Sequence, residues 1–180
     1  MIQLSNLGFY YKKSKPIFNA VSFEIKSGVY GLLGENGVGK TTLLHIMSGM
    51  RFPKEGKCEV LGYQSFSRNP NMLNQLYFLP EEFLASGGTI NQFVKYNTVF
   101  YPNFSNEQLD GYLDEFQIDK EMKMKEVSLG QRKKAMIAFA LALNTPILLL
   151  DEPTNGLDIP SKAQFRKIIA SVTNEEKCIV

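Results

Sequence analysis

The sequence lacks the features that would suggest secretion or a membrane span. No apolar run approaches the length of about 20 residues needed to cross a bilayer. The first residues, Ile2-Gln3-Leu4-Ser5-Asn6, have neither the basic start nor the apolar run of a signal peptide. Only two cysteines occur, Cys58 and Cys178, and their separation excludes a metal-spaced motif. We therefore expect a protein of a reducing cytoplasm, with any membrane role coming through a partner.

The net charge is also small, and histidine is rare. The 20 basic and 18 acidic residues give a net charge of +2, too small to argue for nucleic acid or an anionic membrane surface as a partner. The single histidine, His45, falls within an expected helix, where its spacing favours a packing or surface role over a catalytic one. With 180 residues, 44% of them hydrophobic, the chain has the composition of one ordinary globular domain.

A glycine-rich stretch, residues 34–41, fits the phosphate-binding pattern G-x-x-x-x-G-K-[ST] at every fixed position. Its three glycines let successive N–H groups converge on one concavity, and the positive end of the following helix faces the same anion. We expect Lys40 to reach the β- and γ-phosphates of a nucleotide and the Thr41 hydroxyl to bind Mg²⁺. A chance match in a glycine-rich turn is the alternative. The flanks argue against it, because residues 29–33 read as a buried strand that leads into the loop.

The segment before this loop predicts an antiparallel layer. Residues 1–7 read as a strand, residues 9–16 as a polar, aromatic loop, and residues 21–25 as a half-buried strand. No helix is expected between the two strands. In the loop, Tyr10 and Tyr11 either offer a face on which a purine stacks or simply cover a sheet edge, and the local sequence favours the second.

A short strand and a helical insert are expected next. Residues 76–79 read as a strand that Pro80 ends, with Glu81 and Glu82 following. A carboxylate there is well placed to meet a ligand, and two solvated loop charges are an equally good interpretation. Beyond them, Thr89 and Ser105 predict helix starts in an aromatic-rich segment. Most of its aromatics should form a small core, and any exposed fraction would be a docking face.

A second capping-box pattern occupies residues 128–131, Ser-Leu-Gly-Gln, and predicts a helix through Leu143. The simplest interpretation is only a well-made helix start. The alternative is a second phosphate-binding site, because Ser128 and Gly130 would lie at a helix N-terminus.

An unbroken apolar run, residues 147–150, predicts a strand buried on both faces that ends at Asp151 and Glu152. Two adjacent carboxylates are unfavourable there unless a cation or hydrogen bonds compensate them. We expect Mg²⁺ near Asp151, with Glu152 polarising an attacking water. A strand that merely ends in a turn is the alternative, which the phosphate loop makes less attractive.

Together these motifs resemble the ATP-binding cassette subunit of ABC transporters along the whole chain, residues 1–180. Residues 34–41 match the Walker A loop of that family, 128–131 its signature motif, 147–152 its Walker B motif, and 155–158 the loop that follows. Tyr11 stands where the family usually has an adenine-stacking aromatic, which reverses the preference for a sheet-edge role. Glu81 stands where many members have Gln, in a loop that senses the γ-phosphate and faces the transmembrane subunit.

The resemblance implies an α/β fold: a P-loop NTPase (RecA-like) core with an N-terminal antiparallel β layer and a helical subdomain insert. The expected single nucleotide-binding domain, residues 1–180, divides into an ATP-binding core (1–82 and 127–180) and a helical subdomain (83–126). The partners implied are ATP and Mg²⁺, a transmembrane permease subunit, and a second cassette or a second copy in the ATP-bound state. Nucleic acid is not expected. The protein would then lie on the cytoplasmic face of the membrane, held by its permease. Glu81 resembles the variant of single-cassette bacterial exporters.

The resemblance also assigns the site residues. The catalytic residues are Glu152, Lys40 and Glu81, and the metal ligands are Thr41, Glu81 and Asp151. The nucleotide-binding residues are Tyr11, Asn36, Gly37, Gly39, Lys40, Thr41, Thr42, Ser128, Gly130, Gln131 and Asp158. In the implied mechanism two cassettes enclose two ATP molecules head to tail, so that Ser128 and Gly130 face the nucleotide of the other cassette.

Two departures from the family pattern matter. The signature usually begins Leu-Ser-Gly-Gly-Gln, whereas residues 127–131 read Val-Ser-Leu-Gly-Gln. Family members also carry a histidine beyond the strand at which this chain stops, at Val180, so we expect a C-terminally truncated cassette with weakened turnover. The rival hypotheses are a non-transport ABC ATPase and a nucleotide-gated dimerisation module that does not hydrolyse. Tandem cassettes or a long coiled-coil insertion would favour the first, and the sequence has neither.

Overall fold

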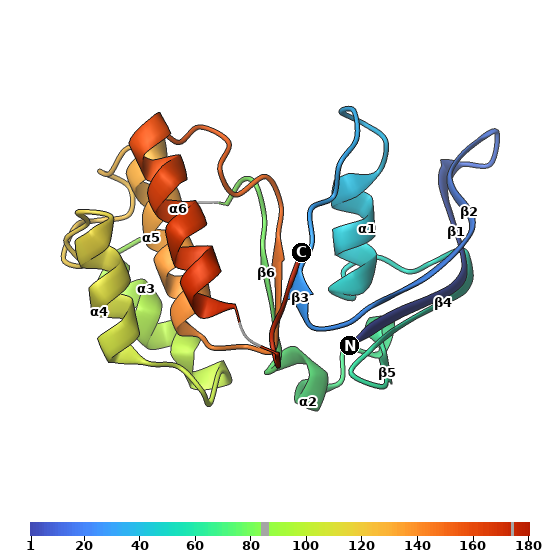
Figure 1. The fold of residues 1–180 in the computed structure, drawn as a ribbon, viewed down its shortest axis with the longest axis horizontal. Helices are drawn as coiled ribbons and strands as arrows, with labels where there is room; N and C mark the ends of the chain where they lie inside the picture. Colours follow the sequence, from blue (N-terminus) through green and yellow to red (C-terminus); the bar gives the residue numbers. More distant parts are fainter. Residues whose placement is uncertain (84–86, 174) are drawn as a thin grey trace.

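Two β-sheets and a set of helices form the molecule (Figure 1). The computed structural model describes residues 1–83, 87–173 and 175–180. The first sheet is antiparallel and has the strand order β2-β1-β4-β5. Its strands are β1 (Ile2–Lys12), β2 (Lys15–Ile25), β4 (Glu55–Val60) and β5 (Tyr63–Gln64). The antiparallel layer predicted at the start of the chain is therefore confirmed.

The second sheet is parallel, with the order β3-β8-β7-β6. Its strands are β3 (Gly28–Val29), β8 (Cys178–Ile179), β7 (Ile147–Leu150) and β6 (Leu76–Leu79). Parallel strands need crossover connections, and here helices lie on both sides of the sheet (Figure 1). The α/β class expected for a P-loop NTPase is confirmed.

The helices divide between the two faces of the parallel sheet. Helix α1 (Lys40–Met47) lies between the two sheets, and α5 (Leu129–Ala142) and α6 (Ile159–Val172) lie on the opposite side (Figure 1). The remaining helices are α2 (Pro70–Leu73), α3 (Ile90–Asn97) and α4 (Asn106–Glu115), with 3₁₀ turns over Ser65–Ser67 and Thr98–Phe100. None of the helices in the described ranges has both the length and the apolarity to span a membrane.

Strand β7 separates two hydrophobic cores. Ile147 and Leu149 belong to the core between the sheets, which α1 fills, while Leu148 and Leu150 belong to the core formed with α5 and α6. Successive side chains of a strand point to opposite faces, so one four-residue strand serves both cores. All four are buried, which confirms the predicted strand. Each buried side chain of this size contributes about 1.5–3 kcal/mol.

Two predictions about the first 33 residues are wrong. The expected loop over residues 9–16 is instead the end of a hairpin: Tyr10 pairs with Pro16 and Lys12 with Lys15 across β1 and β2. The expected buried strand over residues 29–33 stops at Val29, because β8 is its partner only at Cys178 and Ile179. Beyond that short ladder the backbone is irregular, and Leu33 is 95% exposed.

The segment between β6 and α5 is helical, as expected, although residues 84–86 of the predicted insert lie outside the described residues. Thr89 and Ser105 are the N-caps of α3 and α4, and each side chain accepts a hydrogen bond from the backbone three residues on. The aromatics divide as predicted. Phe116 is buried in the core, whereas Tyr96 and Phe100 are 71% and 66% exposed.

Candidate nucleotide site

The glycine-rich loop follows β3 and ends where α1 begins. Gly39, the residue before the helix, has φ of 112°, a left-handed conformation that favours glycine. A Cβ atom at this position would lie 2.5 Å from Cγ2 of Ile17 on β2. The loop therefore packs closely against the antiparallel sheet, and the start of α1 directs its N–H groups and positive dipole at the same space.

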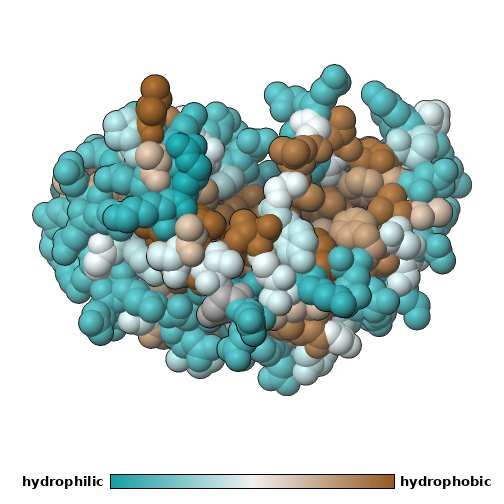
Figure 2. Space-filling view, viewed as in Figure 1, coloured by the Kyte–Doolittle hydropathy of each residue, from teal (hydrophilic) through white to brown (hydrophobic). Residues whose placement is uncertain are grey.

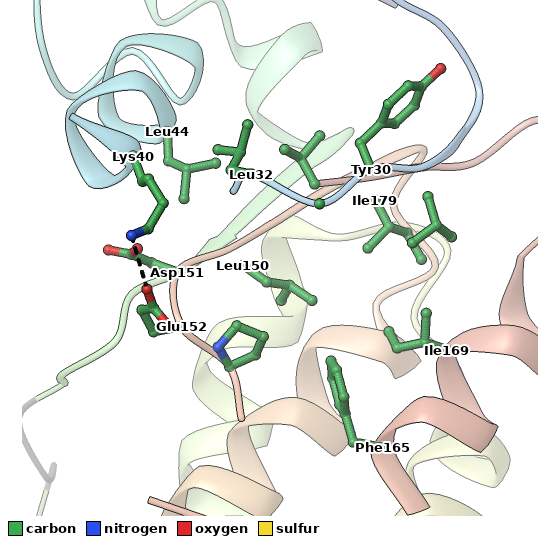
Figure 3. A pocket seen from close by; sticks show the side chains of 14 residues that line it. Tyr30, Leu32, Lys40, Leu44, Leu150, Asp151, Glu152, Phe165, Ile169 and Ile179 are labelled. Carbon is green, nitrogen blue, oxygen red and sulfur yellow. Dashed lines mark ion pairs between the residues drawn. The ribbon is translucent and has the colours of Figure 1, made fainter. Parts of the chain in front are cut away.

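Lys40, the first residue of α1, folds back over the loop. Its ammonium group donates hydrogen bonds to the carbonyl oxygens of Gly34 (2.9 Å) and Glu35 (3.3 Å). It also lies 3.6 Å from Oε1 of Glu152 (Figure 3). The cation therefore joins the loop to the carboxylate that follows β7. With the Glu152 side chain 44% exposed, this ion pair adds little stability and leaves both groups available to a ligand.

Thr41 and Asp151 form the second link between the loop and β7. The Thr41 hydroxyl donates a hydrogen bond of 3.1 Å to Oδ1 of Asp151. Asp151 is 5% exposed, and its own N–H donates to the carbonyl of Leu79, at the end of the neighbouring strand β6. A hydroxyl and a carboxylate side by side are the hard oxygen ligands that Mg²⁺ prefers. Over the described ranges no group of three or more His, Cys, Asp or Glu gathers as a metal cage.

A cavity of about 550 Å³ opens in front of these groups. Its lining residues are Tyr11, Ile17, Asn36, Gly37, Gly39, Lys40, Thr41, Thr42, Glu81, Glu152 and Asn155. Glu81 is fixed at its edge because Nδ2 of Asn155 donates to Oε1 at 2.6 Å. The cavity thus combines a cation, carboxylates and a glycine-rich backbone, which together fit a phosphorylated ligand with a metal ion.

Tyr11 borders the cavity from the antiparallel sheet. Its hydroxyl is 3.0 Å from Oγ1 of Thr42, and the guanidinium of Arg51 lies 5.0 Å from the centre of its ring. The ring also makes an edge contact with Phe9. These contacts hold an aromatic ring that is 58% exposed beside the phosphate loop. The purine-stacking role of Tyr11 stays a prediction.

An apolar pocket of about 220 Å³ lies on the other side of the Lys40–Glu152 pair (Figure 3). Its apolar lining includes Leu32, Leu44, Leu150, Phe165, Ile169 and Ile179. Figure 2 shows apolar side chains near the middle of the molecule, continuing into the part that holds α1. An apolar wall lowers the local dielectric constant, which strengthens the interaction between charges at its edge.

The predicted capping box at residues 128–131 begins helix α5, away from the cavity that Lys40 lines. Ser128 Oγ accepts a hydrogen bond from the Gln131 N–H, and Gln131 Oε1 accepts one from the Ser128 N–H, so the predicted capping box is confirmed. Asp158 caps α6, and its bonds from Ser161 lower the pKa of the Asp158 carboxyl. Ser128, Gly130, Gln131 and Asp158 are therefore not brought to the Lys40 cavity, whose lining they do not join.

His45 packs within α1 rather than facing the cavity. Its ring makes an edge contact with Phe78, and Nε of Arg51 donates to its Nδ1 at 3.4 Å. Burial and the neighbouring guanidinium lower the pKa of this imidazole. The predicted packing role is confirmed.

Sequence reasoning missed Lys133, on α5. Its side chain is buried, and Nζ donates to the carbonyl oxygens of Glu152 (2.8 Å) and Asn155 (2.9 Å). Burial lowers the pKa of the Lys133 ammonium, and the nearby acidic side chains oppose that shift. The sequence offers no signal for this role, because Arg132 and Lys134 stand on either side and any of the three cations could face the core.

Comparisons with known proteins agree with this geometry. A family model described as "ABC transporter" matches residues 18–155. The chain is 34% identical to the molybdate import ATP-binding protein MolC of Haemophilus influenzae, over 99% of this chain and 70% of that protein. It is 31% identical to the zinc import ATP-binding protein ZnuC of Ehrlichia chaffeensis, over 94% and 67% of the two chains. Among solved structures, the ATP-binding cassette MJ0796, a dimer in a post-hydrolysis state bound to ADP and Pi, superposes with a TM-score of 0.81 at 25% identity, over 100% of this chain and 86% of that one.

Proposed function

Because this chain belongs to the ABC transporter family, as an ATP-binding subunit of the kind that hydrolyses ATP, we propose that it couples hydrolysis at the Lys40 cavity to a separate membrane subunit. The observation that carries the proposal is the convergence of Thr41, Asp151 and Glu152 beside the phosphate loop. A non-hydrolysing module would have no need of a carboxylate pair held at the phosphate end of the site.

Lys40 and Glu152 divide the chemistry between them. The Lys40 ammonium, which here rests on two loop carbonyls, turns to the β- and γ-phosphates of ATP when the loop cradles them. Glu152 then loses that cation as its neighbour and is free to accept a proton from the attacking water. Mg²⁺ held by Thr41 and Asp151 would neutralise charge on the phosphates. Glu81 lies at the cavity edge. In the proposal it is the third Mg²⁺ ligand, beside Thr41 and Asp151, and the third catalytic residue, beside Lys40 and Glu152.

The residues that lie outside the cavity support a two-cassette arrangement. Ser128, Gly130 and Gln131 occupy an accessible helix start, where Leu129 is 64% exposed. Such a start binds phosphate well, yet it does not face the chain's own phosphate loop. We propose that these three residues, with Asp158, complete the ATP site of a second cassette or a second copy.

A groove of about 680 Å³ offers a place for the membrane subunit. Met50 and Leu73 line it from the ATP-binding core (residues 1–82 and 127–180), and Phe100 and Tyr101 line it from the helical subdomain (83–126), if the chain is divided as proposed. Pro80 also lines the groove, while the next residue, Glu81, lines the ATP cavity. A movement of Glu81 in response to the γ-phosphate would therefore shift the neighbouring Pro80 in the groove. This adjacency supports the proposal that ATP hydrolysis is coupled to the membrane subunit at the groove.

Trapping the ATP-bound dimer tests the proposal. Glu152→Gln keeps the size of the side chain and removes the base, so the variant should elute as a dimer in saturating MgATP and as a monomer without nucleotide. Glu82→Gln, the same change at an exposed carboxylate, is the matched control and should behave as the wild type. A Glu152→Gln variant that stays monomeric in MgATP would count against the two-cassette mechanism.

Two transport directions are favoured by different observations. The glutamate at position 81 resembles exporter cassettes, which supports export, whereas the relatives MolC and ZnuC are named for import. Inverted membrane vesicles that carry the chain with its co-purified membrane subunit separate the two. ATP-dependent accumulation of the subunit's substrate in such vesicles indicates export, and ATP-dependent loss from preloaded vesicles indicates import.

A further inference from the structure

A buried cation that the mechanism above does not use lies behind the catalytic carboxylate. Lys133 is 4% exposed, and both hydrogen bonds of its ammonium go to backbone carbonyls of one short turn, at Glu152 and Asn155. Within the described part of the chain no carboxylate lies within ion-pair distance of this ammonium. Burying a charge carries a desolvation cost that its hydrogen bonds must offset, which makes the partners of this ammonium informative.

The turn that Lys133 holds has a strained backbone. Glu152 has φ of 45°, the left-handed region that non-glycine residues rarely adopt. The carbonyl of this residue accepts the Lys133 ammonium and the Asn155 N–H (3.1 Å). Strain of this kind persists only where the surroundings fix it, and it collects at functional sites. Here the fixing group is a charged donor, and charge-assisted hydrogen bonds are the strong ones.

We propose that Lys133 is a positioning residue for ATP hydrolysis: it clamps the turn from Glu152 to Asn155 and so holds the Glu152 carboxylate at the phosphate end of the cavity. The same clamp fixes Asn155, whose side-chain amide binds Glu81. One buried ammonium therefore sets the backbone beneath two cavity carboxylates without touching the ligand. This inference rests on the proposed role of Glu152 as the base.

The helix that carries Lys133 gives the clamp a second consequence. Helix α5 begins at Leu129, after Ser128, and reaches Lys133 little more than one turn later. One rigid helix therefore connects two sites. Its start is proposed to face the ATP of a second cassette, and Lys133, further along, holds the catalytic turn of its own chain. The start of α5 also packs on the turn, since a Cβ atom at Gly130 would lie 3.7 Å from the carbonyl oxygen of Gly156.

Lys133→Met is the variant that separates positioning from folding. Methionine nearly keeps the length of the side chain and removes the charge and its donors, so the desolvation cost of the buried ammonium is lost together with its two hydrogen bonds. We expect kcat to fall about 10- to 100-fold, because a small misplacement of a catalytic group costs that much. ATP affinity should stay within about 2-fold of the wild type, since Lys133 touches no ligand. Lys133→Gln keeps two N–H donors on a shorter side chain, so its kcat should lie between those of the wild type and Lys133→Met.

A double-mutant cycle with Glu152→Gln identifies the path of the effect. If Lys133 acts mainly through Glu152, Lys133→Met in the Glu152→Gln background causes a smaller further loss of kcat than it causes alone, and that remainder is the part that acts through Asn155 and Glu81. Losses that multiply would overturn the proposal, and so would a Lys133→Met single variant with wild-type kcat. Lys125→Met, the same change at an exposed position, is the control and should match the wild type.

Hydrogen exchange supplies a readout that does not need turnover. The amides of Asn155 and Leu157 donate to the carbonyl oxygens of Glu152 and Thr154, and in Lys133→Met both should exchange at least about 10-fold faster. The amide of Leu143, at the far end of α5, should exchange at an unchanged rate. Unchanged exchange at the turn would overturn the clamp even if kcat falls. If the wild type binds ATP without hydrolysing it, the proposed function fails, while the exchange result still decides the role of Lys133.

Discussion

The Thr41 hydroxyl donates a 3.1 Å hydrogen bond to Oδ1 of Asp151, a residue 110 positions later in the chain. Thr41 lies in the first turn of α1, and Asp151 directly follows β7. The bond therefore joins the phosphate loop to the carboxyl edge of the parallel sheet, where ligands of open α/β sheets bind. Four predictions follow from this site and its surroundings.

Changing either ligand should reduce the dependence of ATP affinity on Mg²⁺. Thr41→Ala and Asp151→Asn are expected to weaken binding of MgATP by about 10-fold or more, because the first removes a hydroxyl ligand and the second removes the negative charge of the carboxylate ligand. Affinity for ATP in EDTA should be unchanged. Isothermal titration with and without Mg²⁺ measures both values, with Thr41→Ser as the control that retains the hydroxyl. Equal losses in the two conditions would show that the two residues act only on the loop.

Tyr11 is expected to bind the base and not the phosphates. Tyr11→Ala should raise the Kd for ATP by about 5- to 150-fold, which corresponds to the roughly 1–3 kcal/mol of base–aromatic stacking. Tyr11→Phe keeps the ring and loses only the bond to Thr42, so the effect should be a few-fold. Affinity for inorganic tripolyphosphate is the control, because it has no base. Should tripolyphosphate binding weaken as much as ATP binding, Tyr11 would instead be supporting the loop.

Gly39 is expected to tolerate no side chain. Gly39→Ala combines a φ of 112° with a Cβ atom 2.5 Å from Ile17, so it should destabilise the fold by about 1–3 kcal/mol, or roughly 2–12 °C in Tm. Gly37→Ala, at φ of 84° but with open space around the Cβ position, is the matched control and should show only the backbone cost. Adding Ile17→Ala to Gly39→Ala should restore part of the lost stability. No recovery in thermal unfolding would mean that the backbone, or the Phe18 ring 3.0 Å from the same Cβ position, forbids alanine at position 39.

The two cysteines are expected to be unreactive in the folded protein. Burial raises the pKa of both the Cys58 and the Cys178 thiol to about 11. At pH 8 about one thiol in a thousand is then ionised, so Ellman's reagent should react slowly until guanidinium unfolds the chain. The unfolded thiols lose their protons first as pH rises. The stability that the cysteines contribute is therefore complete below about pH 8.5 and falls towards pH 11. Urea unfolding at pH 8 and pH 10.5 measures this loss of unfolding free energy. The loss between the two pH values should be smaller in the double variant Cys58→Val, Cys178→Val than in the wild type.

Several features were readable from sequence because their signals are local. Residues 34–41 carry a contiguous pattern, residues 147–150 an unbroken apolar run, and Thr89 and Ser128 reciprocal capping chemistry within four residues. The structure confirms the strand and the two caps. Other elements depend on distant partners and were predicted wrongly. Tyr11 was expected in a loop, yet the pairing of β1 with β2 carries the strand past it, and β3 is short because its partner strand is.

The phosphate loop and the carboxylates that follow β7 could be predicted from local sequence, because each rests on neighbouring residues whose chemistry is independent of the rest of the chain. The α/β class followed from the resemblance that these motifs carry together. Which side chains share a cavity could not be predicted and depends on the assembled fold. That fold placed Ile17 against Gly39, Asn155 on Glu81, and Lys133 beneath the turn that begins at Glu152. Such contacts join elements that are far apart in sequence. Their energies come from packing and hydrogen bonds that exist only after the sheets and helices have assembled.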